Sequence, residues 1–274
     1  MKKFNIPKFK SMNIEINSDC NRRCVFCPRG QDKTRWKTDE NGKKKLIGNY
    51  MSDELVYSLI DQNLEQEFNA KIGFIFYNEP TLDERLFDFI DYASQKCPGI
   101  DITTNGDKIK KDSNYAREFF KFPITAHISL YDYKDMEGRQ KLIDWWNDYL
   151  IKDLNITKDK FRFTGNYFNF GNRAGLIDRR GKYLAHAKLD DLVPLKASCR
   201  KIHSKLNIRY DGEVPICCED SLVQHSLGNV NNNTISEIWY GEKMKIATEL
   251  LANKKRHAIS PCNKCTKGAK DLEV

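Results

Sequence analysis

Residues 20–27 read Cys20-Asn-Arg-Arg-Cys24-Val-Phe-Cys27, and the interpretation of the whole chain starts from this stretch. It comes directly after residues 11–17, where apolar and polar residues alternate in the pattern of a β-strand. Four cysteine thiolates usually hold a [4Fe-4S] cubane. Three thiolates at this CX3CX2C spacing can each bind one iron, which leaves the fourth iron open to a substrate or cosubstrate.

A zinc site is the alternative for this triplet, but structural zinc normally has four ligands, often from two CxxC-type pairs. The chain contains nine cysteines in 274 residues. Its basic N-terminus lacks the apolar region of a signal peptide, and no apolar run is long enough for a transmembrane helix. We therefore expect metal or redox chemistry in a reducing cytoplasm, rather than a disulfide framework or a membrane protein.

The net charge is +8, from 46 basic and 38 acidic residues. Basic clusters at 2–3, 43–45, 108–111 and 254–256 are spread along the chain, which favours a solvated surface. A nucleic-acid-binding or RNA-modifying protein is the less favoured alternative, and it predicts salt-sensitive RNA binding.

Strand-like and helix-like segments alternate through the first 180 residues. Such alternation predicts βαβ units and a parallel sheet, an α/β fold. About six repeats before residue 185 suit a partial (β/α)6 TIM-like barrel better than a closed eightfold barrel. We expect strands at 11–17, 71–77, 99–104, 124–130 and 160–166, and helices at 53–66, near 113–121, near 136–150 and after a Thr81-x-x-Glu84 capping box.

The pattern changes after residue 190. Residues 205–210 and 213–217 predict a hairpin around Asp211-Gly212, and Thr234 opens a capping box for a helix through about Asn253. We therefore divide the chain into a barrel at 1–188 and a small C-terminal domain at 189–274. The polar segment 28–50 can be a lid, a binding loop or disordered, and the sequence does not decide between them.

Polar residues follow the ends of several predicted strands, where parallel α/β barrels place their chemistry. The segments are Tyr77-Asn78-Glu79-Pro80, Thr103-Thr104-Asn105-Gly106, Ser129, and Asn172-Arg173-Ala174-Gly175. Together with the cysteine triplet, they resemble the motifs of the radical S-adenosylmethionine (radical SAM) enzymes. This resemblance implies that SAM binds the open iron of a [4Fe-4S] cluster and is cleaved to a 5'-deoxyadenosyl radical.

The resemblance also implies roles for individual residues in SAM binding. Phe26 packs by the adenine, and the segment from Tyr77 through Asn78 to Glu79 holds the SAM ammonium in place of the family's Gly-Gly-Glu-Pro. The remaining predicted contacts are Thr104 and Asn105 near SAM, Ser129 at the ribose or the carboxylate, and Arg173 paired with the carboxylate through its guanidinium fork.

A second cysteine set lies in the C-terminal region. Cys199, Gly212-x4-Cys217 and Cys262-x2-Cys265 resemble a shortened SPASM or "twitch" module. The resemblance implies one auxiliary [4Fe-4S] cluster held by four cysteines, with electron transfer as its role. Cys218 is the alternative to Cys217 as a ligand, and a four-cysteine zinc site, as in a non-catalytic interaction module, is the alternative to the cluster.

The leading hypothesis is therefore a radical SAM oxidoreductase. It would abstract hydrogen from a substrate and pass the remaining electron to the auxiliary cluster, drawing on a reductant such as flavodoxin or ferredoxin. The first predicted strand begins near residue 11, which favours a small sugar-like or aminocyclitol-like substrate over a peptide. A peptide- or protein-modifying enzyme and a radical epimerase stay open, and we assign no catalytic base.

Overall fold

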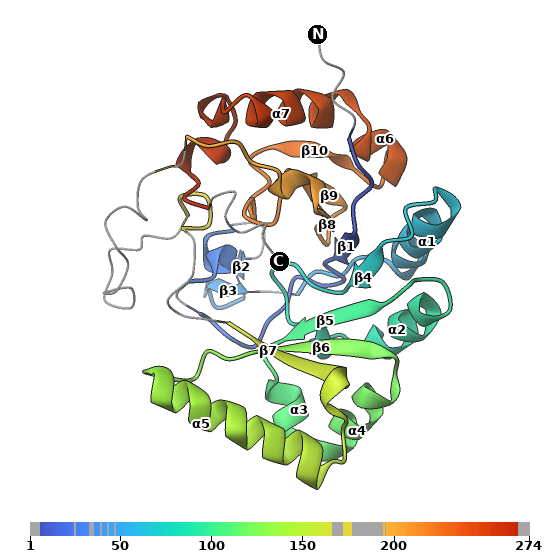
Figure 1. Cartoon of the computed structure of the whole chain (residues 1–274), viewed down its shortest axis with the longest axis vertical. Helices are drawn as coiled ribbons and strands as arrows, with labels where there is room; N and C mark the ends of the chain where they lie inside the picture. Colours follow the sequence, from blue (N-terminus) through green and yellow to red (C-terminus); the bar gives the residue numbers. More distant parts are fainter. Residues whose placement is uncertain are drawn as a thin grey trace.

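The computed structural model describes residues 6–24, 26–32, 36–38, 40–42, 44–46, 48–165, 172–176, 194 and 196–267. At its centre is a six-stranded parallel sheet in the order β7-β6-β5-β4-β1-β8 (Figure 1). The strands are β1 (Ser11–Ile14), β4 (Lys71–Gly73), β5 (Ile100–Thr104), β6 (Ile124–Ser129), β7 (Phe161–Thr164) and β8 (Lys205–Ile208). This open sheet is the predicted partial α/β barrel.

One face of the sheet carries an apolar layer. Five isoleucines from five strands have no exposed surface and share the core cluster with the helices: Ile14, Ile72, Ile102, Ile128 and Ile208. Burying each such side chain stabilises the fold by roughly 1.5–3 kcal/mol. Within each strand, the residues directly before and after the isoleucine point to the other face of the sheet, and this face is largely polar.

Helices connect the strands along the outer side of the sheet (Figure 1). They are α1 (Asp53–Glu65), α2 (Leu86–Ser94), α3 (Asp107–Lys111), α4 (Ser113–Lys121) and α5 (Met136–Asn147), which continues as a π-helical segment (Asp148–Asp153). Helix α1 confirms its prediction, because the Ser52 hydroxyl accepts the Leu55 N–H and acidic residues occupy the first turn.

The predicted capping box at Thr81 is wrong. The Thr81 hydroxyl donates to the Glu79 carboxylate at 2.7 Å instead of capping a helix. Only a short 3-10 helix (Pro80–Leu82) forms there, and α2 begins at Leu86. The side chain is therefore committed to the polar network at the strand ends.

The C-terminal region contains β9 (Glu213–Pro215), β10 (Ser226–Asn229), α6 (Ile235–Trp239) and α7 (Glu242–Ala252). The predicted hairpin at 205–217 is only partly correct. The chain does turn at Gly212, but β8 pairs with β1 in the main sheet while β9 pairs with β10. The segment after residue 188 thus contributes a strand to the barrel, and the division at 188 and 189 stays a prediction.

The predicted single helix from Thr234 is two helices. The Thr234 capping box forms as expected and opens α6. The helix then breaks at Gly241, where a Cβ would lie 2.5 Å from the Glu237 carbonyl oxygen, so only glycine fits this sharp turn.

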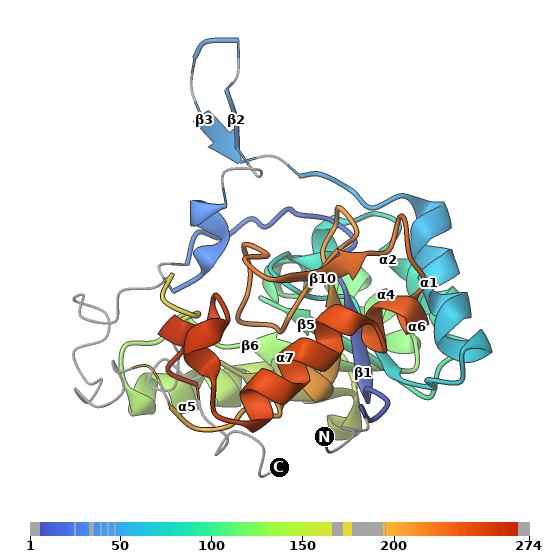
Figure 2. The same ribbon diagram turned by 90° about the horizontal axis from the view of Figure 1, so that it is seen from above.

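The long segment 28–50 contains a short 3-10 helix (Pro28–Gln31) and an antiparallel pair, β2 (Trp36–Thr38) and β3 (Lys44–Leu46). Figure 2 shows this pair projecting away from the rest of the molecule. The remaining short 3-10 helices are Lys158–Lys160, Lys201–His203, Arg256–Ala258 and Cys262–Lys264. Among the described residues, no helix has both the length and the apolar character to cross a membrane.

Candidate active site

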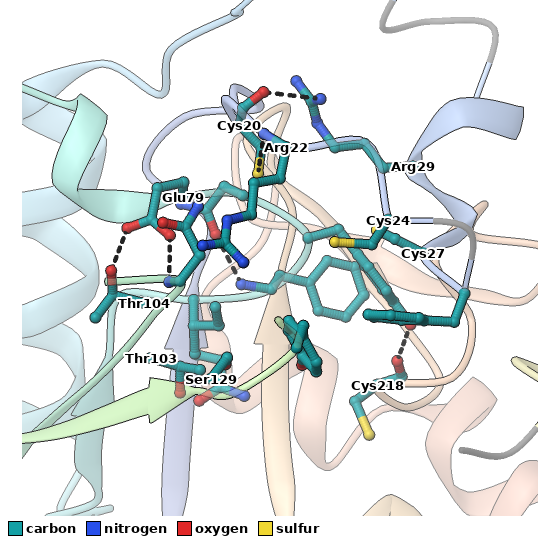
Figure 3. A pocket seen from close by; sticks show the side chains of 18 of the residues that line it. Cys20, Arg22, Cys24, Cys27, Arg29, Glu79, Thr103, Thr104, Ser129 and Cys218 are labelled. Atoms are coloured by element: carbon teal, nitrogen blue, oxygen red, sulfur yellow. Dashed lines mark hydrogen bonds between the residues drawn. The ribbon is translucent and has the colours of Figure 1, made fainter. Parts of the chain in front are cut away.

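The three N-terminal cysteines lie in the loop that leaves the carboxyl end of β1. Cys20, Cys24 and Cys27 line one cavity, with a volume of about 320 Å³, at the carboxyl ends of the strands (Figure 3). The pKa of the Cys24 thiol is raised to about 11. Burial is the main cause, and the neighbouring Cys27 and Cys20 thiols also contribute. The triplet therefore forms one thiol cluster that opens on a cavity.

Two arginines fix the shape of this loop. Arg29 is buried and donates to the Ser18 carbonyl at 2.7 and 2.9 Å. Arg22 forms a two-pronged contact with Asp107 at 2.6 and 2.9 Å and also reaches Asp132 at 2.9 Å. Because Asp107 follows β5 and Asp132 follows β6, Arg22 ties the cysteine loop to two barrel strands.

Glu79 is the centre of a polar network at the ends of β4 and β5. It is 2% exposed, and burial raises its pKa. One oxygen accepts the Thr104 hydroxyl at 2.6 Å and the Thr81 hydroxyl, and the other accepts the Asn105 N–H at 2.6 Å. A carboxylate has about four acceptor positions, so the second oxygen can still receive an ammonium.

Tyr77 and Asn78 also line this cavity. The Asn78 side-chain oxygen accepts the Phe76 N–H at 3.0 Å, whereas its buried amide nitrogen has no hydrogen-bond partner among the described residues. A buried donor without a partner is costly, and a ligand in the cavity would satisfy it. Thr104 and Asn105 line the same cavity. The structure therefore brings these four residues together around one space, and their contacts with SAM stay predictions.

The apolar wall of the cavity is made of Phe26 and Tyr131, whose ring centroids are 4.7 Å apart. Ser129 lines the cavity beside them, with its hydroxyl 3.4 Å from that of Thr164. The sequence motifs do not include Tyr131. Its position directly after the predicted strand 124–130, two residues after Ser129, is the signal that marks it. Gly165 makes room for it, because a Cβ there would lie 2.7 Å from the Tyr131 ring.

Arg173 reaches the cavity through a strained turn. Arg173, Ala174 and Gly175 all have left-handed backbones, with φ of 47°, 52° and 89°. The Arg173 guanidinium lies 5.7 Å from the Tyr77 ring centroid and 3.4 Å from the buried Glu219 carboxylate. The strain is of order 1–3 kcal/mol for each non-glycine residue, and such residues cluster at functional sites.

Comparison with known proteins agrees with this geometry. Residues 199–266 match SPASM, an iron-sulfur cluster-binding domain. The S-adenosyl-L-methionine-dependent 2-deoxy-scyllo-inosamine dehydrogenase of Niallia circulans is 25% identical over 269 residues, which are 94% of this chain and 92% of that protein. These two matches bear out the predicted resemblance to radical SAM enzymes with a C-terminal SPASM domain.

Solved structures show the same fold. BtrN in complex with AdoMet and 2-DOIA matches with a TM-score of 0.70 at 22% identity, over 94% of this chain and 93% of that one. SuiB of Streptococcus suis bound to the precursor peptide SuiA matches with a TM-score of 0.53 at 15% identity, over 95% of this chain and 70% of that one. The predicted fold is therefore confirmed.

The SPASM region, residues 199–266, gathers its own thiols. The pKa of the Cys262 thiol is raised to about 12. Burial is the main cause, and the neighbouring Cys265 and Cys199 thiols also contribute. Burial also raises the pKa of Cys217 strongly, and both Cys218 and Cys262 contribute. Cys262 therefore has Cys199, Cys217 and Cys265 near it, and Cys218, which also acts on Cys217, lines the cavity shared with the N-terminal triplet.

The donor sets fit the family's cofactors, which are [4Fe-4S] clusters and SAM. Three thiols open on a cavity that also offers the Asn78 amide, and four further thiols gather in the SPASM region. Among the described residues, no three Cys, His, Asp or Glu side chains converge closely enough for a single metal ion. The roles of individual residues, including Cys217 rather than Cys218 as a ligand, stay predictions.

Proposed function

We propose that this enzyme oxidises a hydroxyl group of a small polar molecule, a sugar or an aminocyclitol, to a ketone. The supporting observation is one cavity that is lined both by the N-terminal thiols and by Cys218, the neighbour of Cys217. A substrate in this cavity would lie between the two cluster sites. The Niallia circulans relative, a dehydrogenase of 2-deoxy-scyllo-inosamine that matches along almost the whole chain, points to the same substrate class.

When bound, the cofactors would supply a 5'-deoxyadenosyl radical that takes one hydrogen atom from the carbinol carbon, and an auxiliary cluster that accepts the remaining electron. The protein would bind and orient the reactants and exclude water. Phe26 and Tyr131 offer an apolar wall for the adenine, and the second Glu79 oxygen and the Asn78 amide offer polar contacts. We assign no base for the hydroxyl proton.

The test is anaerobic incubation of the reconstituted enzyme with a reductant, SAM and a panel of aminocyclitols and sugars. One substrate should yield ketone and 5'-deoxyadenosine in equal amounts, and deuterium at its carbinol carbon should appear in the 5'-deoxyadenosine. Cys24→Ala should abolish both products. Formation of 5'-deoxyadenosine with a substrate that is changed but never oxidised would contradict the proposal.

Radical epimerisation is a second candidate, favoured by one observation. Cys218 lines the cavity, and an epimerase needs a donor that returns a hydrogen atom to the substrate radical, such as a thiol. Cys218→Ala separates the two reactions. Under the proposed oxidation it still forms ketone, whereas an epimerase would lose product formation and would incorporate solvent deuterium only when Cys218 is present.

The electron supply and the compartment belong to the same proposal. A reductant such as flavodoxin or ferredoxin would deliver single electrons, and the cytoplasm would keep the thiols reduced. None of the nine cysteines, all of which the structure describes, forms a disulfide.

A further inference from the structure

The cavity continues from the thiol triplet down the inner face of the open sheet. Besides the cysteines, it is lined by Asn13 of β1, Thr103 of β5 and Lys205 of β8. Figure 3 shows Thr103 and Ser129 on strands that lie below Cys20, Cys24 and Cys27 in this view. The side chains that face this lower part of the cavity are not needed to hold either cluster.

Strand register places more charged residues on this inner face. Paired residues of neighbouring parallel strands project to the same side of a sheet. Ser11 pairs with both Lys71 and Lys205, and Gly73 pairs with both Asn13 and Asp101. On the other half of the sheet, His127 pairs with Thr103 and with Arg162.

The charges on this face lie close together. The His127 imidazole is 3.4 Å from the Asp101 carboxylate, and this hydrogen bond is the main cause that holds the pKa of Asp101 below its usual value. The Lys71 and Lys205 ammonium groups lower the pKa of Asp101 further, so both act on the same carboxylate. Lys71 and Lys205 are here called the basic floor. Both side chains are exposed, and Lys205 lines the cavity.

The space above the basic floor is kept open. A Cβ at Gly73 would lie 2.6 Å from the Asn13 side-chain oxygen, so a larger residue would crowd the inner face. Asn13 in turn donates to the Asn207 side-chain oxygen at 3.0 Å. Closed α/β barrels fill their interior with branched apolar side chains. Here the part of the interior that Asn13, Thr103 and Lys205 line is polar and carries a positive charge, which suits an anionic ligand.

We propose that the basic floor binds a phosphate monoester on the substrate, so that the enzyme acts on a phosphorylated sugar or cyclitol. This inference rests on the proposed function, because it assigns the far end of the same substrate. Lysine is a usual phosphate binder, and a phosphate dianion would meet the two ammonium groups that act on Asp101. The phosphate would anchor one end of the substrate while its carbinol carbon points toward the cysteine triplet.

Binding of myo-inositol 1-phosphate and of myo-inositol to the reconstituted, SAM-loaded enzyme tests this inference by calorimetry. Myo-inositol 1-phosphate should bind more tightly than myo-inositol, and its affinity should fall as the salt concentration rises. Lys205→Gln should weaken phosphate binding about tenfold or more, whereas Lys205→Arg should retain it. Lys245→Gln on α7 is the matched control, because Lys245 is also exposed but lies outside the cavity.

Equal affinity for the two cyclitols, or equal weakening by Lys205→Gln and Lys245→Gln, would overturn the basic floor as a phosphate site. Formation of ketone and 5'-deoxyadenosine from neutral and phosphorylated cyclitols, measured on the same preparation, tests the proposed function separately. Ketone formation without phosphate preference sinks only this inference, whereas absence of ketone from every cyclitol and sugar tested sinks the proposed function.

Discussion

The Tyr77 hydroxyl donates a hydrogen bond to the Cys218 backbone carbonyl at 2.7 Å. Tyr77 follows β4 of the barrel, while Cys218 follows Cys217 in the SPASM region. The same ring lies under the Arg173 guanidinium. This contact therefore joins the cavity wall to the segment that carries a predicted ligand of the auxiliary cluster.

Tyr77→Phe should loosen this junction. The ring stays in place, but the Cys218 carbonyl loses its donor, which should lower the free energy of unfolding by about 1–3 kcal/mol. Substrate oxidation should fall more than SAM cleavage, because the auxiliary site shifts relative to the cavity. Denaturant unfolding and the ratio of ketone to 5'-deoxyadenosine measure the two effects. Tyr92→Phe is the control, since the Tyr92 hydroxyl bonds to Asp61 instead, and an unchanged product ratio in Tyr77→Phe would refute the coupling.

Arg22→Lys should weaken the hold on the cysteine loop. Lysine keeps the charge but cannot reproduce the two-pronged contact with Asp107 while also reaching Asp132. We expect the KM for SAM to rise roughly tenfold, with a smaller change in kcat. The exposed neighbour Arg23 provides the control variant Arg23→Lys. A KM for SAM that is the same in both variants would show that the Arg22 contacts do not position the loop.

Iron analysis should distinguish Cys217 from Cys218. Two [4Fe-4S] clusters correspond to about eight irons per chain, and loss of the auxiliary cluster should leave about four. Cys217→Ala should cause this loss, whereas Cys218→Ala should keep the full iron content. The reverse pattern would make Cys218 the ligand and Cys217 the buried neighbour. Zinc in place of iron in the SPASM region would contradict the auxiliary cluster itself.

His203 should make stability depend on pH. Burial lowers its pKa below 6.5, and its ring nitrogen lies 2.9 Å from the Thr248 hydroxyl. The unfolded chain therefore binds a proton more readily than the folded one, so stability is present above pH 6.5 and is lost as the pH falls below that value. Denaturant unfolding from pH 8 to pH 5.5 should show a smaller loss in His203→Gln than in the wild type. The exposed His257 supplies the control His257→Gln, which should follow the wild type.

Much of the fold could be predicted because local patterns and tertiary structure agree. The apolar periodicity of α1 and its Ser52 cap predicted that helix within one residue, and the alternation in β5 and β6 marked both strands. The thiol triplet and residues 77–79 line one cavity, because the carboxyl ends of parallel strands lie at the same edge of the sheet.

The errors have physical causes that are not local. Thr81 was assigned to a helix cap because the sequence cannot show that a buried carboxylate, Glu79, competes for its hydroxyl. The pairing of β8 with β1 joins residues almost 200 positions apart, and the local turn at Gly212 concealed it. The basic floor becomes recognisable only when the register of the strands is known, because Ser11 of β1 lies between Lys71 and Lys205.

The central claim is that the Cys20, Cys24 and Cys27 thiols hold a cluster with one iron open to SAM. The most direct measurement is electron paramagnetic resonance of the reduced Cys199→Ala/Cys262→Ala variant, which should retain only the N-terminal cluster, with and without SAM. We predict a [4Fe-4S]+ signal that changes when SAM is added and 5'-deoxyadenosine that accumulates under reductant. A signal that SAM leaves unchanged, with no 5'-deoxyadenosine formed, would contradict the account.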